Sequence, residues 1–160
     1  MTEDEFRKSI CDNRKMLELS LHRHGSNGLT LSVDCKDDMD KIIEDMMATN
    51  RQITFEWLVD LFEHEQKSTD IRTRYGILML VMPHVCENCE CIEHADRLVE
   101  LGLESGDSGL EETACGLAEN TRSERALSLL EKYHETLDGR PWMKSYVGKI
   151  ISELKNELKL

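Results

Sequence analysis

The chain has 160 residues, of which 39% are hydrophobic and 32% are charged, and its formal net charge is −12. This composition excludes a disordered chain and suffices for one domain with a hydrophobic core. The charge argues against nucleic acid and anionic membrane surfaces as direct partners, because both attract Lys and Arg, and it favours either a basic partner or simple solubility.

The lack of a long apolar stretch and of a signal peptide predicts where the protein is located. No apolar stretch approaches the roughly 20 residues that a membrane-spanning helix needs. The N-terminal sequence MTEDEFRKSI is acidic and polar, unlike the start of a signal peptide. We therefore expect a cytoplasmic protein whose six cysteines are reduced.

The chain is predicted to be helical almost throughout, because it contains only two prolines, Pro83 and Pro141. Thr2 and Glu5 have the spacing of a capping box, which predicts an N-terminal helix over residues 2–24. Hydrophobic residues at helical spacing predict further helices over residues 37–49, 54–66, 70–82, 91–104, 110–119, 122–137 and from 141 onwards. The fold class is therefore all-α, with about eight helices.

Local signals define some of the helix ends. Thr54 and Asp70 are predicted as N-caps of the helices that follow them. The segment 77–82 is apolar on every side, which is typical of a buried helix, and Pro83 ends it. Pro141 suits the first turn of the last helix, where its missing N–H costs nothing.

The predicted helices pair as hairpins with a weak internal repeat. First helices begin near residues 37, 70, 109 and 141, and second helices begin near residues 54, 91 and 122. Spacings of about 30 to 40 residues are typical of helical-hairpin solenoids. The period, and the opening of a buried helix by Asp70-Ile71-Arg72, resemble HEAT-type repeats over about 37–160. The resemblance implies an α-solenoid within a single domain, 1–160, and a compact helical bundle is the alternative.

The second helix of each hairpin carries acidic residues at steps of three, four or seven, which share one helical face. In a solenoid, second helices line the concave binding surface, so three such stripes predict an acidic trough that binds a basic protein. The alternative is an ordinary solvated face, as expected for a chain of this charge. The predicted protein-binding residues are Glu56, Asp60, Glu63, Glu93, Asp96, Glu100, Glu124, Glu131 and Glu135.

A cluster of thiol and imidazole side chains is the densest local motif. Its members are His84, Cys86, Cys89, Cys91 and His94. Zinc is held by such ligands in fours, and Cys86-x2-Cys89 has the spacing of a zinc knuckle, but Cys91 follows too closely for a known pattern. A redox pair and incidental thiols are the other interpretations. We predict no cofactor and retain the cluster as a metal or redox alternative.

No catalytic motif is present: the chain lacks a nucleophile elbow, a phosphate-binding loop and a dinucleotide fingerprint. We therefore predict a binding module and not an enzyme. Its size, acidity and helical class resemble the immunity proteins of bacterial toxin systems such as contact-dependent growth inhibition. That resemblance implies binding and neutralisation of a cognate toxin, for example a nuclease with a basic cleft. A general HEAT-type scaffold or adaptor is a further alternative.

Overall fold

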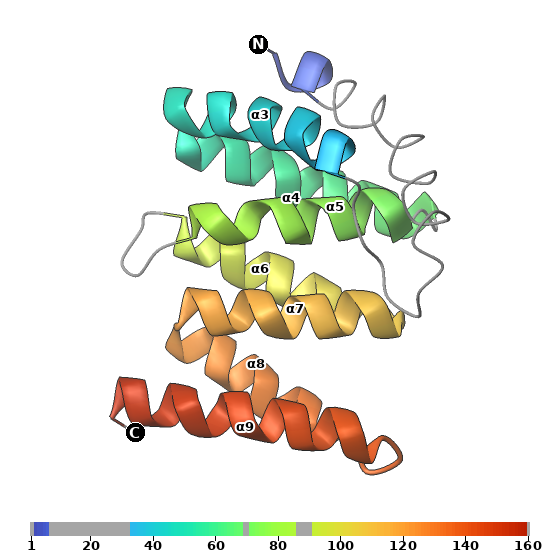
Figure 1. Ribbon diagram of the computed structural model, residues 1–160, viewed down its shortest axis with the longest axis vertical. Helices are drawn as coiled ribbons and strands as arrows, with labels where there is room; N and C mark the ends of the chain where they lie inside the picture. Colours follow the sequence, from blue (N-terminus) through green and yellow to red (C-terminus); the bar gives the residue numbers. More distant parts are fainter. Residues whose placement is uncertain (1, 7–32, 69–70, 86–90, 160) are drawn as a thin grey trace. The chain divides into compact units, whose positions relative to one another are not determined.

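The computed structural model describes residues 2–6, 33–68, 71–85 and 91–159 (Figure 1). The described residues contain helices and no strand, so the all-α prediction is confirmed. None of these helices combines the length and hydrophobicity that crossing a membrane requires. In chain order, the elements are α3 (Val33–Thr49), α4 (Arg51–Ser68), α5 (Ile71–Val81), the short 3-10 helix η1 (Met82–His84), α6 (Ile92–Leu103), α7 (Ser108–Thr121), α8 (Glu124–His134) and α9 (Pro141–Leu158).

The chain divides into two compact units, Met1–His84 and Val85–Leu160, which are described separately below. The prediction of one domain over 1–160 stays a prediction.

At the start of unit 1, the predicted capping box is confirmed. The Thr2 N–H donates to Glu5 Oε2 at 3.0 Å, and the Glu5 N–H donates to Thr2 Oγ1 at 3.2 Å. Helix follows over residues 3–6, and the rest of the predicted helix 2–24 lies outside the described residues.

In unit 1, α3, α4 and α5 pack against one another around large aromatic and aliphatic side chains. Phe6, Phe55 and Phe62 are fully buried, and the Phe6 ring lies 5.7 Å from that of Trp57. The prediction that Thr54 caps α4 is wrong, because Asn50 Oδ1 accepts the Ile53 N–H one turn earlier. Thr54 instead lies inside the helix, where its hydroxyl donates to the Asn50 carbonyl at 2.7 Å.

In unit 2, consecutive helices pack as antiparallel neighbours, and alternate helices also meet. Helix α6 packs on α8 and α7 packs on α9, so the unit has two layers. Figure 1 shows α7 and α9 side by side in front of α6 and α8. The small side chains Ala95, Ala114, Ala118 and Ala126 are fully buried between these helices. The two predicted second helices of this unit, α6 and α8, therefore share one layer.

Side-chain caps fix the ends of these helices. Asp107 Oδ1 accepts the Leu110 N–H at 3.0 Å to start α7, and Ser123 Oγ accepts the Ala126 N–H at 2.9 Å to start α8. The turn before α7 contains Gly106 at φ +76°, a left-handed conformation that favours glycine. Pro141 is the first residue of α9, as predicted. Short capped turns thus hold α6 and α8 in register, which positions the candidate site.

Candidate functional site

The predicted acidic residues are distributed over both units. Glu56 and Asp60 are exposed on α4, and Glu63 is half-buried. These three belong to unit 1, whereas the other six belong to unit 2. The prediction that three stripes form one trough therefore stays a prediction, and the geometry below concerns unit 2 alone.

A groove runs between α6 and α8 on the surface of unit 2, and we call it the α6/α8 groove. It holds two adjoining pockets of about 380 Å³ and about 260 Å³. The first, which we call the N-terminal pocket, is lined by Glu93, Asp96, Arg97, Glu100 and Arg125. The second, which we call the C-terminal pocket, is lined by Glu100, Leu103, Glu104, Glu111, Arg125, Ser128, Leu129, Lys132, Tyr133 and Thr136.

An ion-pair cluster separates the two pockets. The Glu100 carboxylate binds Arg97 of the same helix and, 2.5 Å away, the Arg125 guanidinium of α8. The side chains of Arg97 and Arg125 are 43% and 58% exposed, so water screens both pairs. Glu100 therefore joins α6 to α8. The sequence predicted Glu100 as a binding residue of an acidic stripe, but its carboxylate already pairs with two arginines of the chain.

Asp96 does not lie on the solvent-facing stripe, and the expectation of an exposed residue is wrong. Its side chain is buried, at 7% exposure, and accepts a 2.6 Å hydrogen bond from the Ser123 hydroxyl. Burial raises the pKa of Asp96, while the hydrogen bond from Ser123 lowers it less. Because Ser123 is also the N-cap of α8, Asp96 ties the two second helices together.

The acidic stripe of α8 does not line either pocket. Glu124, Glu131 and Glu135 are exposed, and Glu131 pairs at 3.4 Å with Lys155 of α9. The pocket-lining residues of α8 include Arg125 and Lys132 instead. Arg125 and Lys132 are seven residues apart, which is close to two full helical turns, so they share one side of α8. Because both line pockets together with residues of α6, this is the side of α8 nearest α6. The α6/α8 groove is therefore of mixed charge, with Arg97, Arg125 and Lys132 beside its acidic residues.

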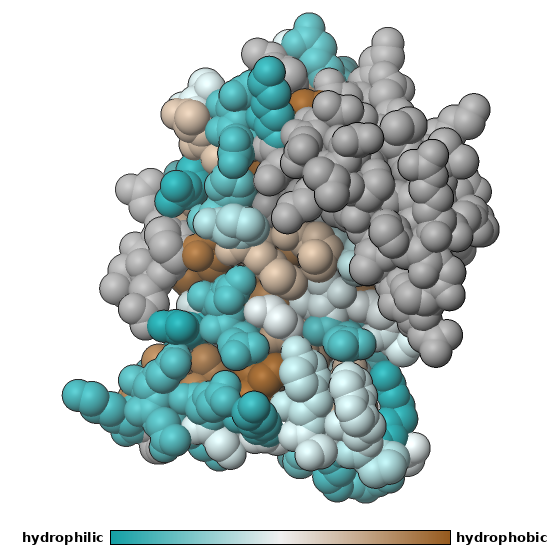
Figure 2. Space-filling view, in the orientation of Figure 1, coloured by the Kyte–Doolittle hydropathy of each residue, from teal (hydrophilic) through white to brown (hydrophobic). Residues whose placement is uncertain are grey.

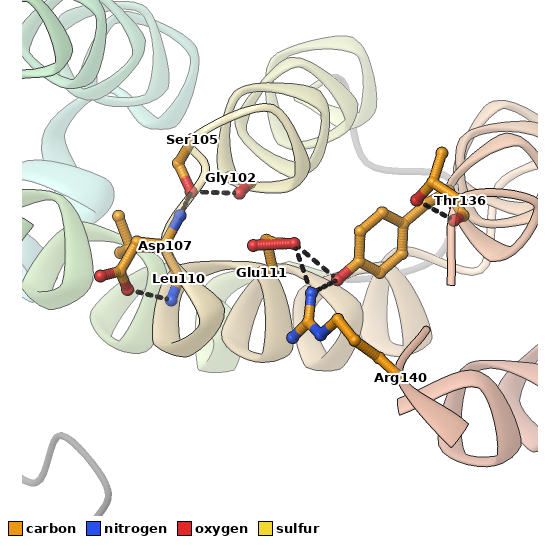
Figure 3. A network of polar contacts seen from close by, with 8 residues as sticks. Gly102, Ser105, Asp107, Leu110, Glu111, Thr136 and Arg140 are labelled. Atoms are coloured by element: carbon orange, nitrogen blue, oxygen red, sulfur yellow. Dashed lines mark hydrogen bonds and ion pairs between the residues drawn. The ribbon is translucent and has the colours of Figure 1, made fainter. Parts of the chain in front are cut away.

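Glu111 and Tyr133, which line the C-terminal pocket, form a polar cluster with Arg140 (Figure 3). Glu111 Oε1 accepts a hydrogen bond from the Tyr133 hydroxyl at 2.8 Å and another from Arg140 at 3.0 Å. The cluster joins α7, α8 and the turn before α9. Burial raises the pKa of Tyr133, and the hydrogen bond to Glu111 raises it further. The phenol therefore stays protonated and holds its donor role at neutral pH.

Glu111, Tyr133 and Arg140 were not predicted from the sequence as functional residues. A signal for Glu111 was present, since it precedes Ala114, Cys115 and Ala118 at the three-, four- and seven-residue steps of a buried face. A carboxylate at such a position needs hydrogen-bond partners. The sequence does not say which residues supply them, because Tyr133 and Arg140 lie 22 and 29 residues away.

The cysteine and histidine cluster is described only in part. Cys91 is buried at the start of α6 and His94 is half-buried within it, whereas His84 belongs to η1 in unit 1. Cys86 and Cys89 lie outside the described residues. Within the described ranges, no group of three or more His, Cys, Asp or Glu side chains could hold a metal ion. The metal alternative stays a prediction.

The buried thiol of Cys115 is poorly suited to chemistry. Burial raises the pKa of the Cys115 thiol to about 12, and the nearby charges of Glu111 and Glu112 contribute to the rise. A thiol with that pKa has almost no thiolate at neutral pH, and the thiolate is the reactive form. Cys115 therefore acts as a small core side chain.

Comparison with known proteins assigns no family to this chain. No family model matches it, and no curated protein and no solved structure matches it either.

Proposed function

We propose that the protein is a cytoplasmic protein-binding module, built as a HEAT-like α-solenoid, that binds a basic partner through the α6/α8 groove. The observation that carries this proposal is the placement of two exposed glutamates. Glu104 is the C-cap of α6 and Glu135 is the C-cap of α8. A helix C-terminus carries partial negative charge and favours a cation, so an acid there opposes the local field.

Both unfavourable acids lie at the same end of the layer. Helices α6 and α8 run in the same direction, so their C-termini lie at one end, beside the C-terminal pocket (Figure 1). The partial negative charges of the two helix C-termini and the carboxylates of Glu104 and Glu135 together make this end of the layer negative. Lys132 opposes them, whereas Arg125 is engaged by Glu100. A positively charged side chain of a partner would relieve the remaining repulsion.

The size of the C-terminal pocket suits one side chain of a partner. Its volume, about 260 Å³, lies below the ~300–1,000 Å³ of pockets that hold drug-sized ligands. A lysine or arginine side chain presented by a protein is a smaller guest with the required charge. Protein interfaces combine a few buried anchor side chains with a surrounding polar rim. The partner's lysine or arginine would be the anchor, and the rest of the α6/α8 groove would be the polar rim that matches the partner's surface in shape and charge.

The toxin-neutralising role is the form of this function that we favour. A toxin that acts on nucleic acid has a basic cleft, and an acidic inhibitor associates with such a cleft quickly through long-range attraction. Residues 85–160 contain 16 acidic and 9 basic residues, which gives unit 2 the required net negative charge. The cognate partner is thus expected to be a basic protein made by the same cell or its neighbours.

The test uses two double variants that remove equal charge. The site variant is Glu104→Gln with Glu135→Gln, and the control is Glu44→Gln with Asp45→Asn on the exposed part of α3. Immobilised wild type and variants capture the partner from native lysate, and its affinity is then measured against ionic strength. We expect the site variant to bind roughly tenfold more weakly, with a flatter salt dependence, and the control to bind as wild type does.

A stability measurement makes this test specific. Because each glutamate opposes a helix dipole, the site variant should be more stable than wild type by about 0.3–1 kcal/mol per residue. Higher stability together with weaker binding is the signature of charges retained for a partner. Equal binding by wild type and the site variant, or equal weakening in both variants, would contradict the proposal.

A further inference from the structure

The other layer of unit 2 carries an exposed aromatic pair that the core does not explain. The Trp142 side chain is 65% exposed, the highest value for any large hydrophobic residue in the described ranges. Its ring stacks on that of Tyr146, with centroids 5.6 Å apart and planes 14° from parallel. The buried stripe of α9 consists of other residues, namely Met143, Val147, Ile150 and Leu154.

The stack leaves one aromatic face available. Tyr146 covers one side of the Trp142 indole, and the high exposure means that the other side is open to solvent. Tryptophan and tyrosine are the residue types most enriched among those that dominate binding energy at protein interfaces. Two such rings held rigidly together by a single turn of α9 form a preorganised platform.

Two carboxylates on α7 adjoin this platform. Glu112 and Glu119 are exposed, and their seven-residue spacing places them on one face of α7, which packs beside α9. Burial raises the pKa of Tyr146, and the charges of Cys115, Glu119 and Glu112 raise it further. Neither glutamate forms an ion pair with any residue in the described part of the chain. On α9, Lys144 pairs with Asp138, and Lys149 is exposed one turn beyond Tyr146.

Figure 2 views the molecule from this side, and the lower part belongs to α7 and α9. Hydrophilic residues cover much of that part, and the hydrophobic atoms visible between the two helices lie toward the middle and the C-terminal half of α9. At the start of α9, the aromatic area of Trp142 and Tyr146 is combined with the negative charge of Glu112 and Glu119 on α7. A neutral apolar partner would leave the carboxylates desolvated without compensation, whereas a second copy of this acidic chain would add repulsion.

We propose that Trp142, Tyr146 and Glu112 form a second docking surface, which binds an arginine side chain of a partner protein. The guanidinium plane lies over the open face of the Trp142 indole, where the ring quadrupole attracts a cation within about 6 Å. Glu112 supplies a carboxylate that accepts hydrogen bonds from the same guanidinium. This surface is separate from the α6/α8 groove, because it belongs to the α7/α9 layer, and it does not depend on the function proposed for that groove.

The experiment follows the indole N–H resonances of the whole chain. The protein has two tryptophans, so Trp142 reports on the platform and Trp57 of unit 1 serves as the internal reference. The probe is a ten-residue peptide of alternating glycine and arginine. A peptide in which citrulline replaces every arginine keeps the shape and removes the charge, and it is the matched control.

The expected result is a saturable shift of the Trp142 resonance with the arginine peptide and none with the citrulline peptide. Trp142→Ala, read through backbone amides of α7 and α9, should weaken binding about fivefold or more, and Trp142→Phe should weaken it less. Glu112→Gln should weaken it about twofold to fivefold, while Glu153→Gln, an equal charge change further along α9, should not alter it. Because Trp142 is mostly exposed, thermal unfolding should confirm that every variant is folded.

Three outcomes would overturn the proposal. The first is a Trp142 shift of the same size with the citrulline peptide, which would indicate apolar contact alone. The second is unchanged affinity in both Trp142→Ala and Glu112→Gln, which would indicate diffuse attraction to an acidic protein. The third is a Trp142 resonance that moves on dilution without peptide, which would indicate that a second copy of the chain covers the platform.

Discussion

Unit 2 contains two charged clusters of similar chemistry and different burial. In the inner cluster, Glu111 has a 10% exposed side chain and accepts from Tyr133 and Arg140. In the outer cluster, Glu100 is 21% exposed and binds Arg97 and Arg125, which are themselves largely exposed. Both clusters join helices that are distant in sequence. Their contributions to stability should differ, because water screens the outer cluster and compensates for lost partners there.

The comparison also separates structural charges from binding charges. Buried Asp96, Glu111 and Tyr133 hold α6, α7 and α8 together through their hydrogen bonds, although the Arg140 side chain that also binds Glu111 is 41% exposed. Glu104, Glu135 and Glu112 are exposed and belong to the two proposed docking surfaces. A net charge alone does not make this distinction.

Removing the inner carboxylate should have the largest effect. Glu111→Ala leaves the Tyr133 hydroxyl and Arg140 without their acceptor and opens a small cavity. We expect the free energy of unfolding to fall by about 2–3 kcal/mol, measured by urea denaturation. Glu111→Gln keeps one acceptor oxygen and should lose less. A loss below about 0.5 kcal/mol in Glu111→Ala would remove the distinction between the clusters.

The Ser123 hydroxyl should come next, because it has two roles. Ser123→Ala removes the N-cap of α8 and the donor to buried Asp96, so we expect a loss of about 1–2 kcal/mol. Asp107→Ala removes only the N-cap of α7 and should cost about 1 kcal/mol. The excess in Ser123→Ala measures the Asp96 contact. Equal losses in both variants would mean that Asp96 gains nothing from Ser123.

The outer cluster should contribute less. Glu100→Gln removes two screened ion pairs, and we expect a loss below about 1 kcal/mol that shrinks as salt is added. Chemical denaturation by urea at low and high ionic strength measures both quantities. A loss as large as that of Glu111→Ala would show that the arginines of α6 and α8 are a structural requirement.

The smallest effect should be a change in pH dependence. Burial raises the pKa of Asp96 above its ordinary value of 3.8, so the folded state binds a proton more tightly than the unfolded state. The free energy of unfolding should therefore fall as pH rises through the interval between 3.8 and the raised value. Asp96→Asn cannot ionise and should lack this fall, and identical pH slopes for wild type and variant would contradict the assignment.

Helix content and most helix ends follow from local chemistry. The capping box at Thr2 and Glu5 and the proline that starts α9 are read from neighbouring residues, and both are confirmed. The helix predicted over residues 91–104 is α6, which is shorter by one residue at each end. The start of α4 was missed because Asn50 and Thr54 are both good caps four residues apart. The earlier cap adds a turn of backbone hydrogen bonds, and the structure adopts it.

The candidate site was harder to predict because it depends on neighbours that are distant in sequence. Helical spacing placed Glu124, Glu131 and Glu135 on one face, and that grouping is a property of the helix alone. Whether such a face lines a groove depends on the rotation of α8 against α6. Arg125 and Lys132 occupy the side nearest α6, and the acids lie beyond them.

The all-α class, the acidity and the recurrence of acidic residues at helical spacing can be read from the sequence alone, because these properties depend on residues within a few turns of one another. The tertiary structure decided which acids are buried, which are paired and which remain for a partner. Asp96, Glu100 and Glu111 acquired their roles from Ser123, Arg125 and Tyr133, which lie 27, 25 and 22 residues away. Burial and pairing arise only when helices pack, so no local pattern reports them.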